Sequence, residues 1–310
     1  MTNREKWKQS NLRRIFQRTF TPFGFISFIV LALYAVSLLF PLIWSVITSF
    51  REPTRFLIDK FMGFGMWPQE WGNPLTWENN YAKVFKNFGL IKYIDKVPTK
   101  IGFAEQLGNS ILYSIGSAIL GTATSLLVAY AASVFKFRAC KVVYTIVIIQ
   151  MILPIVGSFP SEIKMMTSLG LFDTMIGAWI MKTYVSGLHF LIFYSSFKLI
   201  PKEYAEAAEL DGAGNLRIMW NVLFPFVKGS IFTIFLLKFI GFWNDYQTPL
   251  LYMPSLPTLA YGVYDFTRGS ITSDTPTQLA ATMLMAVPLF IIFIAFQKRL
   301  LGDLSVGGLK

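Results

Sequence analysis

The side chains that most often perform chemistry are scarce in this sequence. It contains one histidine, His189, and one cysteine, Cys140, among 310 residues. A zinc site needs several such ligands at short spacing, and neither that spacing nor an H-E-x-x-H or G-x-S-x-G motif occurs. The phosphate-binding sequence G-x-x-x-x-G-K-[ST] does not occur either. We therefore expect no catalytic residue, metal site or cofactor in this chain, and we do not expect it to be an enzyme.

Polar side chains inside long apolar segments form a second group of candidates. Burying them in lipid is costly, so such residues tend to face protein or a water-filled path. One short stretch joins hydrogen-bonding groups to aromatic faces, which suits a polar ring-shaped ligand: Trp243, Asn244, Asp245 and Tyr246. Anchoring of the aromatic residues at a membrane interface is the alternative interpretation.

Three basic residues also interrupt apolar segments. Lys182 and His189 lie seven positions apart, on one face of an unbroken helix, where they either line a path or snorkel and pack. Lys238 lies near the middle of its segment. We expect it to face protein or water, where an acidic group could pair with it.

The composition places these residues in a membrane protein. The chain is 54% hydrophobic and 15% charged, whereas soluble domains are about 25% charged. Crossing a bilayer takes about 20 mostly apolar residues in a helix. Six segments qualify, so we predict an all-α polytopic protein with transmembrane helices near 23–48, 107–135, 142–161, 176–197, 229–250 and 279–297. In the second, small residues recur at every fourth position from Ser117 to Ser133, which indicates a seam with another subunit or packing within one bundle.

The distribution of Lys and Arg predicts the orientation. Residues 1–22 carry six, 136–141 three, 198–228 four and 298–310 three, whereas the opposite loops 162–175 and 251–278 carry one each. Basic residues gather in cytoplasmic loops, so both termini are expected in the cytoplasm. The net charge of +11 is spread between the apolar segments and forms no patch, so we predict no nucleic-acid binding.

The cytoplasmic loop 198–228 has the pattern of a helical elbow. Pro201, Glu203 and Glu206 favour the start of a helix, and alanines continue it. Gly212 can end that helix, and Asp211 can cap a second one from about 213 to 223, which Pro225 would stop or kink. Such an elbow either docks into a groove on another protein or is a simple connector.

This loop resembles the EAA loop of binding-protein-dependent ABC transporter permeases. Glu206, Ala207 and Ala208 are followed by three residues and Gly212, and nine further residues lead to Val222-Leu-Phe-Pro225, where the family has I-x-L-P. The resemblance implies that the residues that contact the ATPase are Glu203, Glu206, Ala207, Ala208, Asp211, Gly212, Ala213 and Pro225.

Two other stretches resemble the carbohydrate-importer branch of that family, which includes maltose permease. One is the fifth-span stretch from Phe239 to Tyr252, and the other is the tail from Gln297 to Lys310. The resemblance implies that Gly302, Gly307 and Gly308 contact the ATPase dimer. It further implies a type I importer permease fold, a second permease subunit, two cytoplasmic ATPases that bind the ATP, an extracytoplasmic binding protein, a sugar substrate and a bacterial inner membrane.

The expected organisation has five parts. They are a cytoplasmic tail at 1–22, a first span at 23–50, an external lobe at 51–106, a permease core at 107–297 and a cytoplasmic tail at 298–310. An ion-coupled secondary transporter is the alternative, but Lys182 and Lys238 make a poor ion relay and no inverted repeat is visible. An ABC permease for a non-sugar solute is the other alternative.

Overall fold

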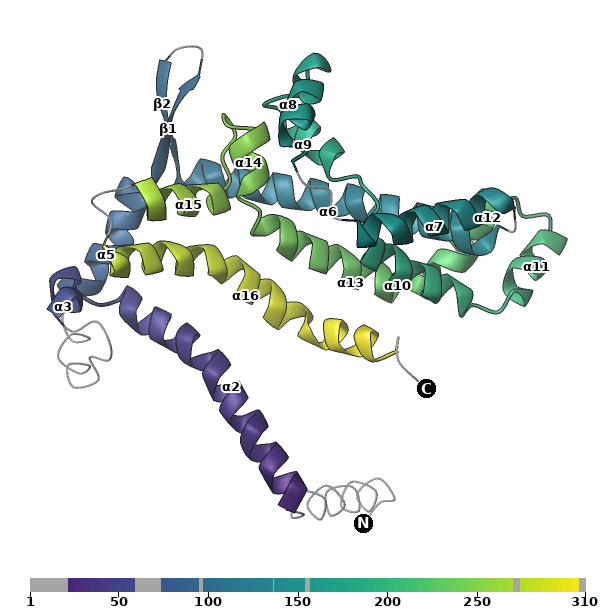
Figure 1. The fold of residues 1–310 in the computed structure, drawn as a ribbon, viewed down its shortest axis with the longest axis horizontal. Helices are drawn as coiled ribbons and strands as arrows, with labels where there is room; N and C mark the ends of the chain where they lie inside the picture. Colours follow the sequence, from purple (N-terminus) through teal and green to yellow (C-terminus); the bar gives the residue numbers. More distant parts are fainter. Residues whose placement is uncertain are drawn as a thin grey trace. The chain divides into compact units, whose positions relative to one another are not determined.

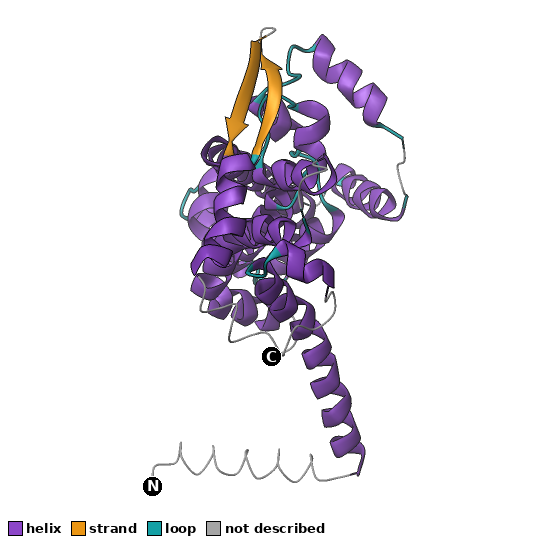
Figure 2. Ribbon diagram, turned by 90° about the vertical axis from the view of Figure 1, so that its left-hand side faces the viewer, coloured by secondary structure: helices purple, strands orange, loops and turns teal. Residues whose placement is uncertain are grey.

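The computed structural model describes residues 22–58, 74–94, 97–135, 137–153, 157–269 and 274–306. Helices make up nearly all of this part of the chain (Figure 2), as the all-α prediction requires. The chain divides into two compact units, one comprising 1–82 and 274–283 and the other 83–273 and 284–310. We call them unit 1 and unit 2.

Unit 1 contains the first long helix. Helix α2 (Pro22–Ser49) is apolar throughout and is followed by α3 (Pro53–Ile58) and the start of α5 (Pro74–Asn87). Buried Asn80 on α5 donates to the carbonyl oxygens of Ser49, at 3.0 Å, and Arg51, at 2.7 Å. These two bonds satisfy carbonyl groups at the carboxyl end of α2, which have no partner within the helix.

Unit 2 begins with a β-hairpin that the sequence analysis did not predict. Strands β1 (Gly89–Ile94) and β2 (Val97–Gly102) pair antiparallel, with Leu90 opposite Ile101. Both of these side chains are buried, because the hairpin turns one face toward the unit. The hairpin leads directly into α6.

Three helices form the centre of unit 2. Helix α6 (Phe103–Val134) packs against α13 (Phe224–Trp243) and α10 (Gly187–Lys198), as Figure 1 shows. The small-residue stripe of α6 is buried within this bundle, with Ser117, Ser125 and Ala129 all at 0% exposure. The packing interpretation of the stripe is therefore correct, because small side chains let α13 and α10 approach the α6 backbone.

Two predicted spans are wrong as continuous helices. In place of 142–161, α7 (Arg138–Ile152) ends before extended Leu153, and α8 (Phe159–Ser168) follows. The residue before a proline avoids the helical conformation, and Leu153 precedes Pro154. In place of 176–197, α9 (Met175–Met181) and α10 are separated by five residues, so Lys182 and His189 do not share one helix.

The first, second and sixth predicted spans are helical, apart from residue 135 at the end of the second. Four described helical stretches are long and apolar enough to cross a membrane, at 22–49, 103–134, 215–243 and 275–297. The predicted fifth span continues past α13 into a separate short helix, α14 (Gln247–Tyr252). Helix α15 (Leu259–Gly269) follows, and α16 (Thr275–Val306) contains the predicted sixth span.

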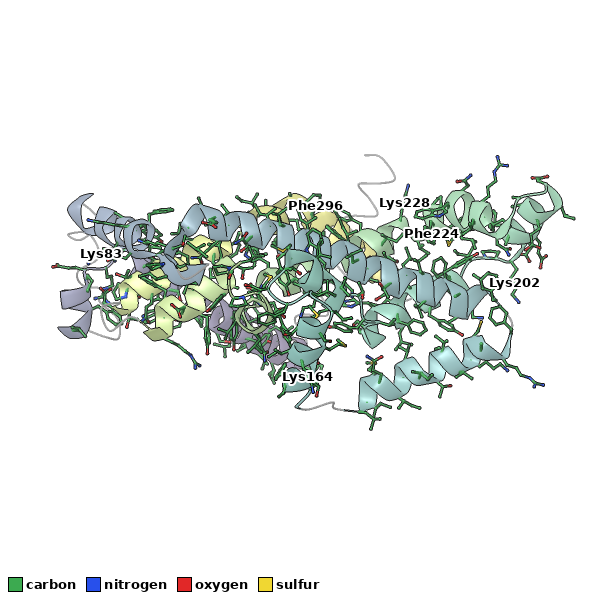
Figure 3. All side chains as sticks on the ribbon, turned by 90° about the horizontal axis from the view of Figure 1, so that it is seen from above. Lys83, Lys164, Lys202, Phe224, Lys228 and Phe296 are labelled. Atoms are coloured by element: carbon green, nitrogen blue, oxygen red, sulfur yellow. The ribbon has the colours of Figure 1, made fainter. Side chains whose placement is uncertain are left out.

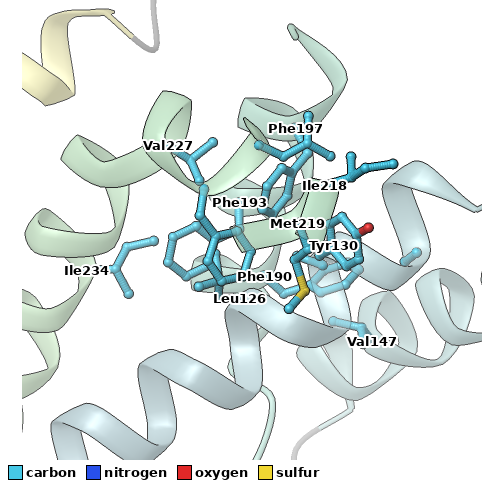
Figure 4. Close-up of a cluster of buried hydrophobic side chains, with 14 residues drawn as sticks. Leu126, Tyr130, Val147, Phe190, Phe193, Phe197, Ile218, Met219, Val227 and Ile234 are labelled. Atoms are coloured by element: carbon cyan, nitrogen blue, oxygen red, sulfur yellow. The ribbon is translucent and has the colours of Figure 1, made fainter. Parts of the chain in front are cut away.

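An aromatic-rich core holds α6, α10 and α13 together (Figure 4). Phe190 and Phe193 of α10 are fully buried between Leu126 of α6 and Ile234 of α13. The Tyr130 ring packs edge-on against Phe197, with centroids 5.7 Å apart. These contacts fix the end of the bundle that carries the loop 198–228.

Replacing Phe190 by Ala should destabilise the protein strongly. Removing a fully buried phenylalanine leaves a cavity and costs about 3–5 kcal/mol in well-packed cores. Phe290→Ala is the matched control, because Phe290 is 45% exposed. Thermal unfolding of the purified protein in detergent should show a much larger loss for Phe190→Ala, and equal losses would contradict the core described here.

Candidate functional site

The predicted elbow is present and ends where the sequence analysis placed it. Helix α11 (Glu203–Leu210) is followed by Gly212 with φ +78°, a conformation that L side chains rarely adopt. The amides of Gly212 and Ala213 donate to the carbonyl oxygens of Glu209 and Ala208, both at 3.0 Å. This pair of bonds closes the helix end, and it requires the left-handed backbone that glycine accepts most readily.

The two faces of α11 differ in what they contact. Ala205 and Ala208, together with Ala213 after the turn, pack against the aromatic-rich core. Glu203, Glu206 and Ala207 are exposed, as are Asp211 and Gly212. Leu210 at the tip is 89% exposed. The predicted coupling residues are therefore divided between a partly buried inner face and an outer face that no described residue covers.

The second arm of the elbow differs from the prediction. Asp211 ends α11 and does not cap the next helix, since the residue in the capping position is Gly214. Helix α12 (Asn215–Ile218) passes through a π turn, η1 (Met219–Leu223), straight into α13. Exposed Pro225 therefore does not stop the helix: the wider π turn, in which the Phe224 amide bonds the Met219 carbonyl, relieves the clash that proline causes in a regular helix.

A second group of polar side chains surrounds Asp245, between α13 and α14. Its carboxylate accepts hydrogen bonds from the hydroxyl groups of Tyr113, at 2.7 Å, and Thr248, at 2.6 Å, and from the Thr248 amide at 3.0 Å. Lys182 Nζ forms an ion pair with the same carboxylate at 3.1 Å. We call these four residues the Asp245 cluster.

The Asp245 cluster explains the break between α9 and α10. Lys182 is the first residue after α9, and its carbonyl oxygen lies 2.9 Å from where a Cβ on Gly121 would be. Backbone outside a helix is tolerated at membrane depth only where protein or water covers it. Gly121 gives the broken segment room to lie against α6, and the ion pair neutralises the lysine that this break brings inside.

The remaining predicted path residues do not join this cluster. Trp243 is 2% exposed and donates its ring N–H to the Met285 carbonyl at 3.1 Å, so it is a packing residue. Asn244 is exposed and bonds the Ile240 carbonyl on its own helix at 2.9 Å. His189 contacts the Ser186 hydroxyl at 3.0 Å.

Tyr246 belongs to a separate aromatic group. Its ring stacks on that of Tyr264, with centroids 4.3 Å apart and an angle of 12° between the planes. The guanidinium of Arg268 lies 4.9 Å from the Tyr264 centroid. Tyr246 is 40% exposed, so this aromatic group remains accessible at the surface of unit 2.

Tyr113 and Thr248 belong to the Asp245 cluster but were not predicted from the sequence. Tyr113 lies one helical turn before Ser117, so the small-residue stripe extended backwards by four positions would have reached it. Thr248 lies three positions after Asp245, the spacing at which an aspartate caps a following helix. Of the predicted tail residues, Gly302 lies within α16, and Gly307 and Gly308 fall outside the described residues.

A further carboxylate lies in the segment after α7. Glu162 on α8 accepts hydrogen bonds from Ser158 and from the hydroxyl of Tyr252 on α14. These bonds hold the pKa of Glu162 below its ordinary value. Burial and the neighbouring carboxylate raise the pKa of Tyr252, so the tyrosine keeps its proton and joins α8 to α14.

The elbow and the hairpin lie at opposite ends of unit 2. In Figure 1, α11 lies at one end of α6, and β1 and β2 lie beside the other. Figure 3, seen from above, places Lys202, which precedes α11, and Lys83, which precedes the hairpin, at opposite ends in the same way. The predicted cytoplasmic loop 198–228 and the described part of the predicted external lobe in this unit are thus separated by the length of the helices.

Comparison with known proteins gives consistent matches. Residues 121–305 match the family described as binding-protein-dependent transport system inner membrane component. The diacetylchitobiose uptake system permease protein NgcG of Streptomyces coelicolor is 25% identical over 92% of this chain and 88% of its own. The melibiose/raffinose/stachyose import permease protein MelC of Bacillus subtilis is 30% identical over 66% and 76%.

A solved structure confirms the predicted fold class. A chain of a bacterial ABC transporter involved in the import of the acidic polysaccharide alginate matches with a TM-score of 0.65 and 23% identity. The match covers 89% of this chain and 95% of that one. The likeness therefore extends over nearly the whole fold of both chains.

Removing one partner of the Lys182–Asp245 ion pair should cost more stability than removing both. The two side chains are only 18% and 17% exposed, so Asp245→Asn leaves a largely covered ammonium unpaired and Lys182→Met a largely covered carboxylate, and each single variant should lower the Tm in detergent. The double variant removes both charges, so its Tm should exceed that of either single variant. Additive losses across the three variants would show that the two side chains do not interact.

Proposed function

The chain belongs to the family of binding-protein-dependent transport system inner membrane components, and from this premise we propose that it is the membrane-spanning permease subunit of an ATP-driven sugar importer. It moves a sugar or oligosaccharide that an extracytoplasmic binding protein delivers. Partner ATPases hydrolyse the ATP, and this chain carries no cofactor. Both termini lie in the cytoplasm of a bacterial cell.

The observation that carries this proposal is the elbow with an exposed outer face. Leu210 of α11 and Leu216 of α12 are 89% and 73% exposed, and Glu203 and Glu206 of α11 are exposed as well. Exposed apolar side chains on a projecting helix that also carries charges are typical of a surface that enters a groove on another protein. We assign that groove to a cytoplasmic ATPase, one on each of two permease subunits.

The inner face of the elbow supports its role in coupling. Ala205, Ala208 and Ala213 pack on the core that joins α6, α10 and α13, so a push on α11 reaches all three helices. Gly212 fixes the angle between α11 and α12 through its backbone conformation. ATP-driven closure of the ATPases would thus tilt the bundle and alternate its inward and outward openings.

The solute assignment has two supports. The relatives NgcG and MelC are named for diacetylchitobiose and for melibiose, raffinose and stachyose, all of them carbohydrates. The accessible Tyr246 ring and the Asp245 cluster supply an aromatic face and hydrogen-bonding groups, the combination that sugar rings favour. We propose that the solute passes Tyr246 and Asp245 on its way through the pair of permease subunits.

Replacing Gly212 by Val should uncouple transport. Valine at a positive φ is strained by about 1–2 kcal/mol, which corresponds to roughly a tenfold loss of the competent elbow. Gly214→Val is the matched control, because Gly214 has φ −72° and no atom lies within 4 Å of the position its Cβ would take. Sugar uptake into proteoliposomes and the ATP turnover that accompanies it should both fall about tenfold for Gly212→Val only. Survival of both activities in Gly212→Val would refute the coupling role.

Replacing Leu210 by Asp should weaken the binding of the ATPase without unfolding the permease. The side chain is 89% exposed, so the isolated chain should keep its Tm. In the complex the aspartate would be desolvated in an apolar groove, and co-purification with the ATPase should drop at least tenfold. Leu169→Asp is the control, because Leu169 is 62% exposed and follows α8, well outside the elbow loop. Equal co-purification of both variants would place the ATPase contact elsewhere.

A further inference from the structure

Lys238 is a buried cation for which the described residues provide no anion. It lies on α13 and is 6% exposed. Its Nζ lies 3.1 Å from where a Cβ on Gly121 would be, and 5.8 Å from the centroid of the Tyr184 ring. In the part of the chain that the structure describes, no carboxylate is paired with it. A buried ammonium without a partner is strongly unfavourable, so this position calls for an opposite charge.

The charged groups near Lys238 do not supply an opposite charge. Among the described residues, Asp245 already pairs with Lys182 and accepts three hydrogen bonds. His189 also interacts electrostatically with Lys238, but it is a potential second cation. The Lys182–Asp245 pair is neutral by itself. The charge of Lys238 therefore remains uncompensated among the described residues.

Helix α6 adds hydrogen-bond donors on the face that meets Lys238. The hydroxyl groups of Ser114 and Ser117 are buried and have no partner among the described residues. Ser114, Ser117 and Gly121 follow one another at spacings of three and four, so they lie along one face over about 10 Å. Buried hydroxyl groups in native proteins nearly always have partners, so two on one face also call for an absent acceptor.

Tyr184 links the buried Lys238 to the surface of unit 2. This residue lies in the break between α9 and α10, and its side chain is 53% exposed although the lysine beside its ring is buried. A ligand that reaches the exposed tyrosine ring can thus extend toward the ammonium group. An aromatic ring next to a cation and a row of hydroxyl donors is suited to a sugar that carries a negative charge.

We propose that Lys238, Ser117 and Tyr184 form a binding site for the anionic group of an acidic carbohydrate, such as a carboxylate or phosphate on a sugar. This inference rests on the proposed transport function and specifies its solute class. The ammonium pairs with the anion, the Ser117 hydroxyl donates to it, and the Tyr184 ring contacts the sugar. The positive charge is then balanced only while solute is present, which favours acidic over neutral sugars in the path.

The test measures the thermal stability of the purified complete transporter with three probes: glucuronate, glucose 6-phosphate and neutral glucose. The wild type should gain Tm with both anions in a saturable way, and should not respond to glucose or to sodium chloride at equal ionic strength. Lys238→Met should lose the shift and keep or raise the Tm without ligand, because it removes an unbalanced buried charge. Lys228→Met is the matched control, since Lys228 is exposed on the same helix and should keep the full shift.

Two results would overturn the proposal. If Lys238→Met lowers the Tm without ligand and the wild type shows no shift with either anion, the lysine pairs with a carboxylate of the second permease subunit. If the wild type shows no shift and Lys238→Met leaves the Tm unchanged, the position binds no anion.

The measurement is independent of the elbow. The Gly212→Val transporter should keep the shift with anions, so loss of coupling and loss of the anion site are separate outcomes. Gly121→Ala provides a second variant: the added methyl group would meet Lys238 Nζ at 3.1 Å and the Lys182 carbonyl oxygen at 2.9 Å. It should weaken the response to both anions while it retains the positive charge.

Discussion

Hydrocarbon offers no hydrogen-bond partner, and the interior of unit 2 is organised around that constraint. Two of the breaks in the predicted spans, one between α9 and α10 and the other between α13 and α14, meet at Asp245. Asp245 joins the two interruptions, since it accepts the amide of Thr248 at the start of α14 and pairs with Lys182 at the end of α9. One carboxylate thus satisfies a helix end and neutralises a cation, which makes both breaks tolerable inside the bundle.

The need to cover polar groups away from hydrocarbon also explains the small-residue stripe of α6. A methyl group at Gly121 would collide with the Lys182 carbonyl oxygen and come close to the Lys238 ammonium, so the glycine admits one polar group from each break-bearing segment. Further along, Ser125 and Ala129 admit ordinary helix packing. The stripe was a candidate for contact with another subunit, but elements of the same chain cover it. Helices α10 and α13 pack on one part of it, and polar groups of Lys182 and Lys238 lie against Gly121.

How much of this was predictable depends on the range of the interactions involved. The end of α11 depends on neighbouring residues only, because a helix-favouring run followed by Gly212 sets the backbone there. The position of this helix end was therefore predicted correctly from the sequence. The break at Lys182 is set by Gly121 and Asp245, more than 60 residues away on either side in the sequence, so no local pattern marks it. Hydropathy indicated a continuous span there because the interrupted segment is apolar on average.

The candidate site also contains both kinds of feature, those that a local sequence pattern marks and those that depend on distant residues. The motif Glu206 to Gly212 could be recognised from spacing alone, whereas the role of Tyr113 appears only when α6 is packed against α13. Trp243 and Asp245 lie two positions apart, and both were predicted to line the substrate path, but their surroundings in the structure differ. Trp243 bonds the Met285 carbonyl, while Asp245 turns to Lys182. A membrane-embedded polar residue can be identified from sequence, but its partner cannot, because it comes from another helix.

The π turn before Pro225 keeps the second arm of the elbow and the helix that leads to the Asp245 cluster continuous. A proline within a regular helix would have kinked α13 at its base and uncoupled it from α12. Because the π turn absorbs the proline, the helical run from Asn215 to Trp243 is continuous over 29 residues, a rod of about 43 Å. One end of this rod is the second arm of the elbow, and the other ends two residues before Asp245. In the coupling that we propose, a displacement of the elbow is carried to the Asp245–Lys182 pair along this single helix.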